Sequence, residues 1–315
     1  MIGFVVRRLL ALVPLLFIIS FVVFALSTLI PGDPAVTLAG GTRATPESIA
    51  EVRDKLDLDD PFFVRYGAWL GDVVRGDLGE SLLRNSDVSH EIANRFPVTF
   101  SVAIGALFVT VLIGVPLGIL AGTRPGRRRD RAITLGTSAG IAIPDFWLAM
   151  VFVVFFSVNR QWLPSQGYVP PAESVVEWAR HLVLPWLALG LAGACALARQ
   201  LRGALADVLE QDYIRTAAAK GLRRRLVVGK HALKNASIAP LTVLGLQFAY
   251  MLGGTVILER IFSIPGMGQY FYTALVNKDL PIIQGVTLVV ATTFVVVNLA
   301  VDVLYAYVNP RVRLG

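Results

Sequence analysis

Residues 204–235 read ALADVLEQDYIRTAAAKGLRRRLVVGKHALKN and form the longest basic segment of an otherwise apolar chain. The first half has apolar residues at helical spacing, which gathers them on one face: Leu205, Val208, Leu209 and Tyr213. Small residues then lead to Lys220, and Gly221 follows as a typical helix stop. A small-residue helix ending at a glycine offers a close-packing surface to another protein. A solvated basic loop placed by membrane charge rules explains the same pattern.

The composition is that of a membrane protein. The chain has 315 residues, of which 55% are hydrophobic and 16% are charged, whereas soluble domains have about 25% charged residues. The net charge of +7 is therefore attributed to loop orientation in a membrane, and nucleic-acid binding is not expected. The single cysteine, Cys195, excludes an intramolecular disulfide and a thiolate metal cluster.

Six segments are long and apolar enough to cross a bilayer: residues 9–30, 98–123, 132–159, 182–198, 237–258 and 282–301. A signal peptide is the alternative for the first segment. Its apolar core would be about 7–15 residues long and would end at a small-residue cleavage site, whereas Pro31-Gly32-Asp33-Pro34 follows here. The first segment is therefore expected to be a transmembrane helix.

The basic residues predict the orientation of these spans. Eighteen of the 29 lysines and arginines lie at the two termini and in the loops 124–131 and 199–234. These are alternate loops, so the positive-inside rule places them and both termini in the cytoplasm. No pattern predicts a strand, and the expected fold is all-α. Residues 1–97 are expected to form a first helix with an external segment, and residues 98–315 a five-helix core.

Two spans have features that affect packing. Gly114, Gly118 and Gly122 lie four residues apart, so another helix can approach this bare face closely. Pro144-Asp145 interrupts the third span, where the proline removes a backbone donor and predicts a kink. A carboxylate inside a span is a candidate for function, so Asp145 either lines a passage or pairs with a structural partner. For Asp302, near the end of the last span, local pairing or solvation is favoured.

The two largest external segments have their own local structure. Residues 33–95 contain 7 basic and 12 acidic residues, and Thr45-Pro46 predicts the start of a short helix over residues 47–58. Aromatic residues from Phe62 to Trp69 predict a second amphipathic helix. In the last external loop, Pro265-Gly266 predicts a turn, followed by a short helix over residues 270–278.

Motifs for chemistry are absent from the sequence. Gly229-Lys230 lacks the upstream glycine of a phosphate-binding loop, so no nucleotide site is expected in this chain. The three histidines are scattered without a carboxylate or cysteine at metal-ligand spacing, and no serine lies in a G-x-S-x-G elbow. We therefore expect no catalytic residue and no metal site.

The ordered set of motifs resembles the membrane permease subunit of dipeptide and oligopeptide ATP-binding cassette (ABC) importers. The resemblance covers essentially the whole chain. It is carried at the start by Pro31-Gly32-Asp33-Pro34, then by Gly76-Asp77-Leu78-Gly79-Glu80-Ser81, Ile143-Pro144, Asp212-Tyr213-Ile214-Arg215-Thr216-Ala217, Ala219-Lys220-Gly221, His231-Ala232-Leu233-Lys234-Asn235, Pro265-Gly266-Met267-Gly268 and Asn309-Pro310-Arg311. No single motif is specific, but their order is.

The resemblance implies a type I ABC importer permease fold, with residues 204–235 as the cytoplasmic coupling loop. Its short helix would dock on an ATPase subunit through Asp212, Tyr213, Arg215, Thr216, Ala217, Ala218, Lys220 and Gly221. The general importer pattern is Glu-Ala-Ala, three residues, then Gly. Arg215-Thr216-Ala217 stands at the triplet here, so contacts that depend on the glutamate cannot be carried over.

The resemblance also implies partners and further sites. A second homologous permease, two ATP-binding domains carrying ATP and Mg²⁺, and an external substrate-binding protein are expected, and the chain itself is expected to hold no cofactor. Candidates for the translocation path are Pro144, Asp145 and Phe146. Candidates for an external gate or binding-protein contact are Gly76, Asp77, Gly79, Ser81, Pro265, Gly266, Gly268 and Asp279.

The predicted function is to form the pathway for ATP-driven peptide import across the cell membrane. Nickel complexes, oligosaccharides and haem are alternative cargoes, since close relatives of the family carry them. An ion-coupled secondary transporter is a rival from another class. It would normally have several midplane carboxylates and internal repeats with broken helices, whereas only Asp145 qualifies here. A membrane-embedded enzyme is disfavoured by the absence of paired acids and metal ligands.

Overall fold

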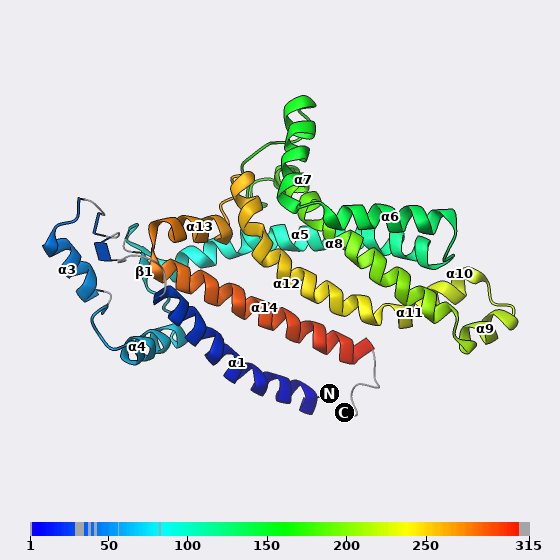
Figure 1. Ribbon diagram of the computed structural model, residues 1–315, viewed down its shortest axis with the longest axis horizontal. Coiled ribbons are helices and arrows are strands. Elements are labelled where there is room, and N and C mark those ends of the chain that lie inside the picture. Colours follow the sequence, from blue (N-terminus) through cyan, green and yellow to red (C-terminus); the bar gives the residue numbers. More distant parts are fainter. Residues whose placement is uncertain are drawn as a thin grey trace. The chain divides into compact units, whose positions relative to one another are not determined.

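The computed structural model describes residues 2–28, 35–36, 39–40, 43–55, 57–81 and 83–308. Within these ranges, the side chains of residues 2–9, 27–28, 55, 302 and 304–308 are not described, so the expected surroundings of Asp302 lie outside the description. The regular secondary structure of the described residues is helical (Figure 1), apart from one two-residue strand pair. The all-α prediction is confirmed.

The chain forms two compact units, and α5 (Val88–Gly122) and α14 (Leu280–Val308) each contribute to both. Unit 1 consists of residues 100–264 and 296–315, and unit 2 of residues 2–99 and 265–295. In unit 2, residues of the range 265–295 pack with residues of the range 78–99 around one apolar core. The expected division into residues 1–97 and 98–315 stays a prediction.

Apart from α5 and α14, each helix belongs to one unit. The helices of unit 2 are α1 (Ile2–Thr28), α3 (Pro46–Lys55), α4 (Phe62–Val74) and α13 (Met267–Asn277). Unit 1 contains α6 (Arg128–Ala142), α7 (Asp145–Phe152), η2 (Val153–Asn159), α8 (Val175–Leu209), α9 (Asp212–Ala219), α10 (Arg224–Leu226), η3 (Val227–Ala232), α11 (Leu233–Ala236) and α12 (Ile238–Ile261).

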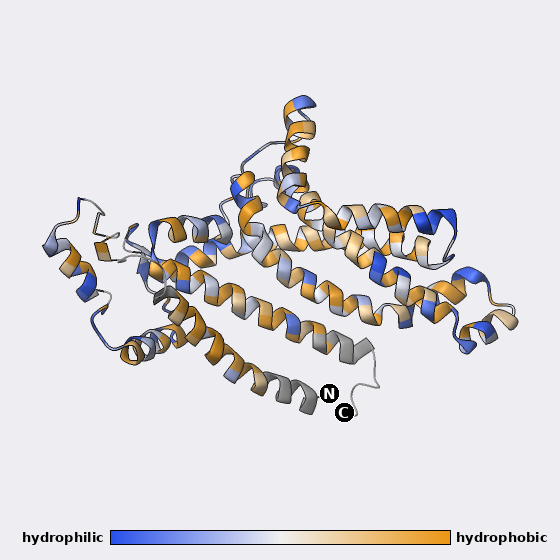
Figure 2. Ribbon diagram, viewed as in Figure 1, coloured by the Kyte–Doolittle hydropathy of each residue, from blue (hydrophilic) through white to orange (hydrophobic). Residues whose placement is uncertain are grey.

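Helix α8 is the centre of unit 1, with α6, α7 and α12 packed along it (Figure 1). The polar residues of this unit gather where α6 begins and where α9 and α10 lie, whereas the helices between are largely apolar (Figure 2). Two of the predicted cytoplasmic loops therefore lie at the same end of unit 1.

The glycine face of α5 allows the close helix contact that the sequence predicts. A Cβ atom at Gly114 would come within 2.8 Å of the Ala194 carbonyl oxygen of α8. One at Gly122 would come within 2.9 Å of the Arg202 carbonyl oxygen. Real Cβ atoms do not approach other atoms this closely, so only glycine permits the observed distance between the two backbones.

The third predicted span is broken by a bend of 97° between α6 and α7. Ile143 and Pro144 between them have extended backbone, with ψ of 123° and 138°. A proline disfavours helical geometry in the residue before it, so the helix ends at Ala142 and restarts at Asp145. The predicted kink at Pro144 is confirmed, and it is a complete break.

Four described helices are long and apolar enough to span a membrane, and the bent pair makes a fifth. They are α5, α8, α12 and α14 with the pair α6–α7. Helix α1 has 27 residues, and its side chains are described over the apolar stretch Leu10–Leu26. A sixth span at the start of the chain stays a prediction.

Unit 2 contains the short helices that the sequence predicts. Helix α3 begins at Pro46, and the Thr45 hydroxyl accepts a hydrogen bond from the Ser48 amide at 3.2 Å. Helix α4 packs on α1 through edge-to-face aromatic contacts, among them Tyr66 with Phe21 and Phe24. Helix α13 follows the turn at Pro265-Gly266 and ends at Asn277, and Lys278 directly after it has left-handed backbone.

Two details differ from the predictions. Strands β1 (Glu80–Ser81) and β2 (Ser86–Asp87) form a two-residue antiparallel pair where no strand was expected. Apolar spacing also predicted one helix through Leu205 and Tyr213. Instead, α8 ends at Leu209, and extended backbone at Gln211 separates it from α9. The apolar residues Leu205, Leu209 and Tyr213 keep a four-residue spacing across this break by coincidence. Their spacing alone therefore could not reveal where α8 ends.

Candidate functional site

Helix α9 is the short helix predicted to couple to a partner. Ile214 is its buried residue and lies in an apolar core with Leu205 of α8 and Val227 of η3. Ala217 packs against the same core. The helix is therefore packed on α8 by its inner face.

The outer face of α9 carries most of the predicted coupling residues, all of them exposed: Asp212, Tyr213, Arg215, Thr216, Ala218 and Lys220. The Tyr213 hydroxyl accepts a hydrogen bond from the Asn235 side chain at 2.7 Å, which ties α9 to α11. Gly221 ends the segment with φ of +81°, and a Cβ atom there would meet no atom within 4 Å. This face is open to a docking partner.

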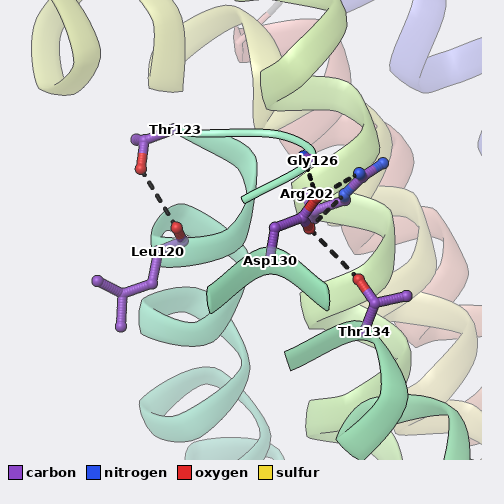
Figure 3. A network of polar contacts seen from close by, with 6 residues as sticks. All are labelled: Leu120, Thr123, Gly126, Asp130, Thr134 and Arg202. Carbon is purple, nitrogen blue, oxygen red and sulfur yellow. Dashed lines mark hydrogen bonds and ion pairs between the residues drawn. The ribbon is translucent and has the colours of Figure 1, made fainter. Parts of the chain in front are cut away.

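A second polar site joins the turn between α5 and α6 to α8 (Figure 3). Asp130 is 3% exposed, and its two carboxylate oxygens accept hydrogen bonds from Arg202 at 3.0 and 2.8 Å. The Gly126 amide donates to the same carboxylate at 2.7 Å, and the Thr134 hydroxyl donates at 3.3 Å. Every lone-pair direction of this buried acid thus has a donor nearby, as buried charges require.

The same turn is held from another direction by the coupling segment. The Arg224 guanidinium, in α10, donates a hydrogen bond of 2.6 Å to the carbonyl oxygen of Thr123. Arg202 lies one helical turn before Leu205, which belongs to the core under α9. The start of α6 is therefore connected to α9 both through α8 and through α10.

The bend between α6 and α7 opens on a cavity of about 710 Å³. The predicted path residues Pro144, Asp145 and Phe146 all line it, together with residues of α8 and α12. Asp145 is partly buried at the first position of α7, and among the described residues its carboxylate has neither a hydrogen-bond donor nor an ion-pair partner. This arrangement differs from that of Asp130, at the other end of the same broken span.

Several predicted external residues meet in unit 2. The Ser81 hydroxyl donates a hydrogen bond of 2.6 Å to the Asp279 carboxylate, and both residues are buried. Burial raises the pKa of Asp279, which lies outside the membrane-spanning part of α14. These two residues connect β1 to the start of α14.

The other external candidates shape the same region. Gly76 and Gly79 have φ of +88° and +85°, and the Asp77 carboxylate accepts a hydrogen bond from the Gly79 amide. Gly266 precedes α13, and Gly268 is buried within it. Pro265 lies in the turn before α13, and of this group Gly76, Asp77 and Pro265 are exposed.

Comparison with known proteins assigns the family. Residues 114–314 match the binding-protein-dependent transport system inner membrane component, and residues 1–103 match the N-terminal part of such membrane components. The chain belongs to this family of membrane permeases. Its members are transport components, so the permease is not an enzyme.

Relatives match the permease along its whole length. A putative peptide transport system permease protein of Brucella abortus (strain 2308) is 39% identical, with 99% of each chain covered. The dipeptide transport system permease protein DppB of Alkalihalophilus pseudofirmus is 38% identical, covering 99% of this chain and 100% of its own. The glutathione transport system permease protein GsiC of Escherichia coli O6:H1 is 40% identical, with 99% of each chain covered.

Solved structures support the fold. A chain of the MetNI methionine ABC transporter in an inward-facing conformation superimposes with a TM-score of 0.58 at 19% identity. The match covers 69% of the permease and 96% of that chain. The type I ABC importer permease fold and a multi-pass membrane location follow from the family and this likeness.

Sequence reasoning missed three residues of these sites. Asp130 is the single acid among five arginines in the turn 124–131, and this contrast was a signal that it pairs with one of them. Gln247 and Tyr250 line the cavity from α12. A glutamine inside an apolar span is the signal that could have identified the first of these two.

Proposed function

We propose that the chain is one of two permease subunits of an ATP-driven importer and forms part of its pathway for dipeptides and oligopeptides. The names of the relatives support a peptide cargo. The observation that carries the proposal is the exposed face of α9, which is fixed from behind by its own apolar core. A rigid, exposed helix at the polar end of the membrane helices is suited to receive force from a soluble partner.

The contacts of unit 1 supply a route from that partner to the cavity. An ATP-binding subunit, holding ATP and Mg²⁺, docks on α9 and moves it when it closes. The core around Leu205 and the Asp130–Arg202 pair transmit this movement to the start of α6. Helix α6 has 15 residues, so its far end lies about 22 Å away, at the bend that lines the cavity. Opening and closing of the cavity then follow ATP binding and release.

The external side receives cargo from a substrate-binding protein. Residues 33–95 are net acidic and lie outside the membrane in the proposed orientation, with both termini in the cytoplasm. The Ser81–Asp279 hydrogen bond joins this segment to the loop before α14. A binding protein that contacts Gly76 and Asp77 thereby also acts on the start of the last span.

Reconstituted uptake tests the proposal. The purified complex, formed with a second permease, the ATPases and the binding protein, is inserted into proteoliposomes without an ion gradient. A labelled dipeptide should accumulate only when ATP is supplied. Uptake driven by an imposed ion gradient without ATP would instead support the secondary transporter. ATP-dependent uptake of a nickel complex, an oligosaccharide or haem, without uptake of a peptide, would support the ATP-driven mechanism and contradict the proposed peptide cargo.

Two variants of one position test the role of α9. Gly221→Asp and Gly221→Asn have nearly equal side chains, and both residues tolerate left-handed backbone better than most. Because a Cβ atom there meets nothing within the chain, neither variant should prevent insertion. We expect Gly221→Asp to reduce uptake per ATP hydrolysed and Gly221→Asn to do so less, since only the former adds charge to the docking face. Normal coupling in an assembled Gly221→Asp complex would reject α9 as the coupling helix.

A further inference from the structure

The cavity at the bend between α6 and α7 lies wholly within unit 1. Its volume of about 710 Å³ falls within the range of about 300–1,000 Å³ that small-molecule sites occupy. The lining comes from the bend, from the middle of α8 and from α12: residues 141–146, Leu189, Ala192, Gly193, Ala196, Val243, Leu246, Gln247, Tyr250, Met251, Gly254, Ile257 and Leu258. Almost all of these side chains are apolar.

Three lining residues have polar side-chain groups, and one of them is charged. These are Asp145, Gln247 and Tyr250. Ligand sites commonly combine an apolar wall with a few polar groups that fix the ligand's orientation. The cavity has this composition, and its single formal charge is negative.

The Asp145 carboxylate has no donor among the described residues. A carboxylate in a membrane-spanning segment is costly in lipid, so it is expected to face a partner, a ligand or water. The bend does not need the acid, since extended backbone at Ile143 and Pro144 produces it. The carboxylate is therefore available to a group that enters the cavity.

Gln247 provides a second acceptor without a donor. Its Oε1 atom is buried and has no hydrogen-bond partner. It lies beside Gly193 of α8, where a Cβ atom would come within 2.6 Å of it. A larger residue at position 193 would therefore displace this amide, and the glycine keeps room for it. Gln247 thus lines the cavity opposite the helix that carries Asp145, and its buried amide oxygen is unsatisfied.

Tyr250 adds an exposed aromatic ring to the same lining, with 67% of its surface exposed. Aromatic faces attract cations, and a ring with a hydroxyl group also accommodates a peptide backbone. Together, the three side chains match a ligand that supplies hydrogen-bond donors and positive charge. An anionic group would be repelled, and a divalent metal ion would find only one carboxylate.

We infer that this cavity is a cargo subsite in which Asp145 binds the protonated α-amino group of a peptide, with Gln247 and Tyr250 beside it. The inference rests on the proposed peptide cargo and adds a feature that the permease itself recognises. It predicts that the permease distinguishes peptides by their amino terminus, separately from the binding protein.

The test compares a peptide that has a free amino terminus with its N-acetylated form in the reconstituted complex. Each permease variant is combined with the same binding protein, so any change in the uptake ratio of the two peptides originates in the permease. Asp145→Asn should lower uptake of the free peptide about tenfold, the effect of losing one hydrogen bond to a charged group. Uptake of the acetylated peptide should be unchanged, and Gln247→Leu should shift the ratio in the same direction by less.

Controls separate this inference from folding and from the proposed function. Asp145→Glu retains the charge and should keep most of the preference for the free peptide. Glu173→Gln removes an exposed acid elsewhere in unit 1 and should leave the ratio unchanged. An equal loss of both peptides per assembled complex, or no loss of either, would overturn the subsite. If the wild-type complex imports neither peptide with ATP, the proposed cargo fails instead.

Discussion

Asp130 and Asp145 are two acids of the same broken span, 15 residues apart, in opposite surroundings. The Asp130 carboxylate accepts four hydrogen bonds, two of them from Arg202 (Figure 3). The Asp145 carboxylate lines an apolar cavity and accepts none from the described residues. Burying a charged carboxylate in a membrane-spanning segment costs free energy at either position. The contacts of Asp130 indicate an acid that holds helices together, whereas those of Asp145 indicate an acid that is available to a ligand.

The largest effect is expected from Asp130→Ala. Removing one partner of a buried ion pair typically costs about 3–5 kcal/mol. Because the Arg202 side chain is 36% exposed and partly hydrated afterwards, we expect a loss of about 3 kcal/mol in the free energy of unfolding. Thermal unfolding of the purified permease in detergent measures the change.

Asp212→Ala is the matched control, because its pair with Arg215 is almost fully exposed, with a distance of 3.6 Å. Exposed pairs contribute about 0–1 kcal/mol. If both variants lowered the unfolding temperature equally, the Asp130–Arg202 pair would not hold α6 to α8.

A smaller effect of opposite sign is expected from Asp145→Leu. Burying a polar group without a partner costs about 1–3 kcal/mol in proteins, and Asp145 is only partly buried. Its replacement by leucine should therefore stabilise the permease by about 1 kcal/mol in the same unfolding assay. Destabilisation comparable to that of Asp130→Ala would mean that the Asp145 carboxylate has a structural partner, and the contrast between the two acids would disappear.

The sequence predicts features that depend on neighbouring residues better than contacts between residues far apart in the chain. Pro144 breaks the span because proline acts on its own neighbours, and the glycines at positions 114 and 122 mark the face that approaches α8. Thr45-Pro46 likewise marks the start of α3. Each of these signals is contained within a few residues, so spacing and backbone chemistry suffice to read it.

Contacts between distant residues could not be predicted in this way. Asp130 and Arg202 are 72 residues apart, and Ser81 and Asp279 are 198 apart. Five arginines near Asp130 offered closer partners in sequence, and only the packing of α5 and α6 on α8 selects Arg202. The family resemblance marked Ser81 and Asp279 as candidates for an external gate or contact, and the structure adds the hydrogen bond that joins them within unit 2.

Asp279 is an intermediate case that sharpens the comparison. One of its carboxylate oxygens accepts the Ser81 hydrogen bond, and the other is buried without a hydrogen-bond partner. The residue is 1% exposed, and burial raises its pKa above the ordinary value of 3.8 despite the stabilising Ser81 contact. Only one of its two carboxylate oxygens has a hydrogen-bond donor, so Asp279 should contribute less to the free energy of unfolding than Asp130 does. Because its pKa is shifted, this contribution should depend on pH.

The sign of this dependence follows from proton binding. With a raised pKa, the folded state binds more protons than the unfolded state once the pH exceeds about 3.8. The contribution of Asp279 to stability is therefore complete below that pH and is lost as the pH rises toward the pKa of the folded state.

Asp279→Asn keeps an acceptor for Ser81 and cannot ionise, so the stability of this variant should fall less than that of the wild type between pH 4 and pH 8. Thermal unfolding across this range measures the difference, with Asp77→Asn as the exposed control from the same region. Parallel curves for the wild type and Asp279→Asn would show that Asp279 ionises in the fold as freely as it does in the unfolded chain.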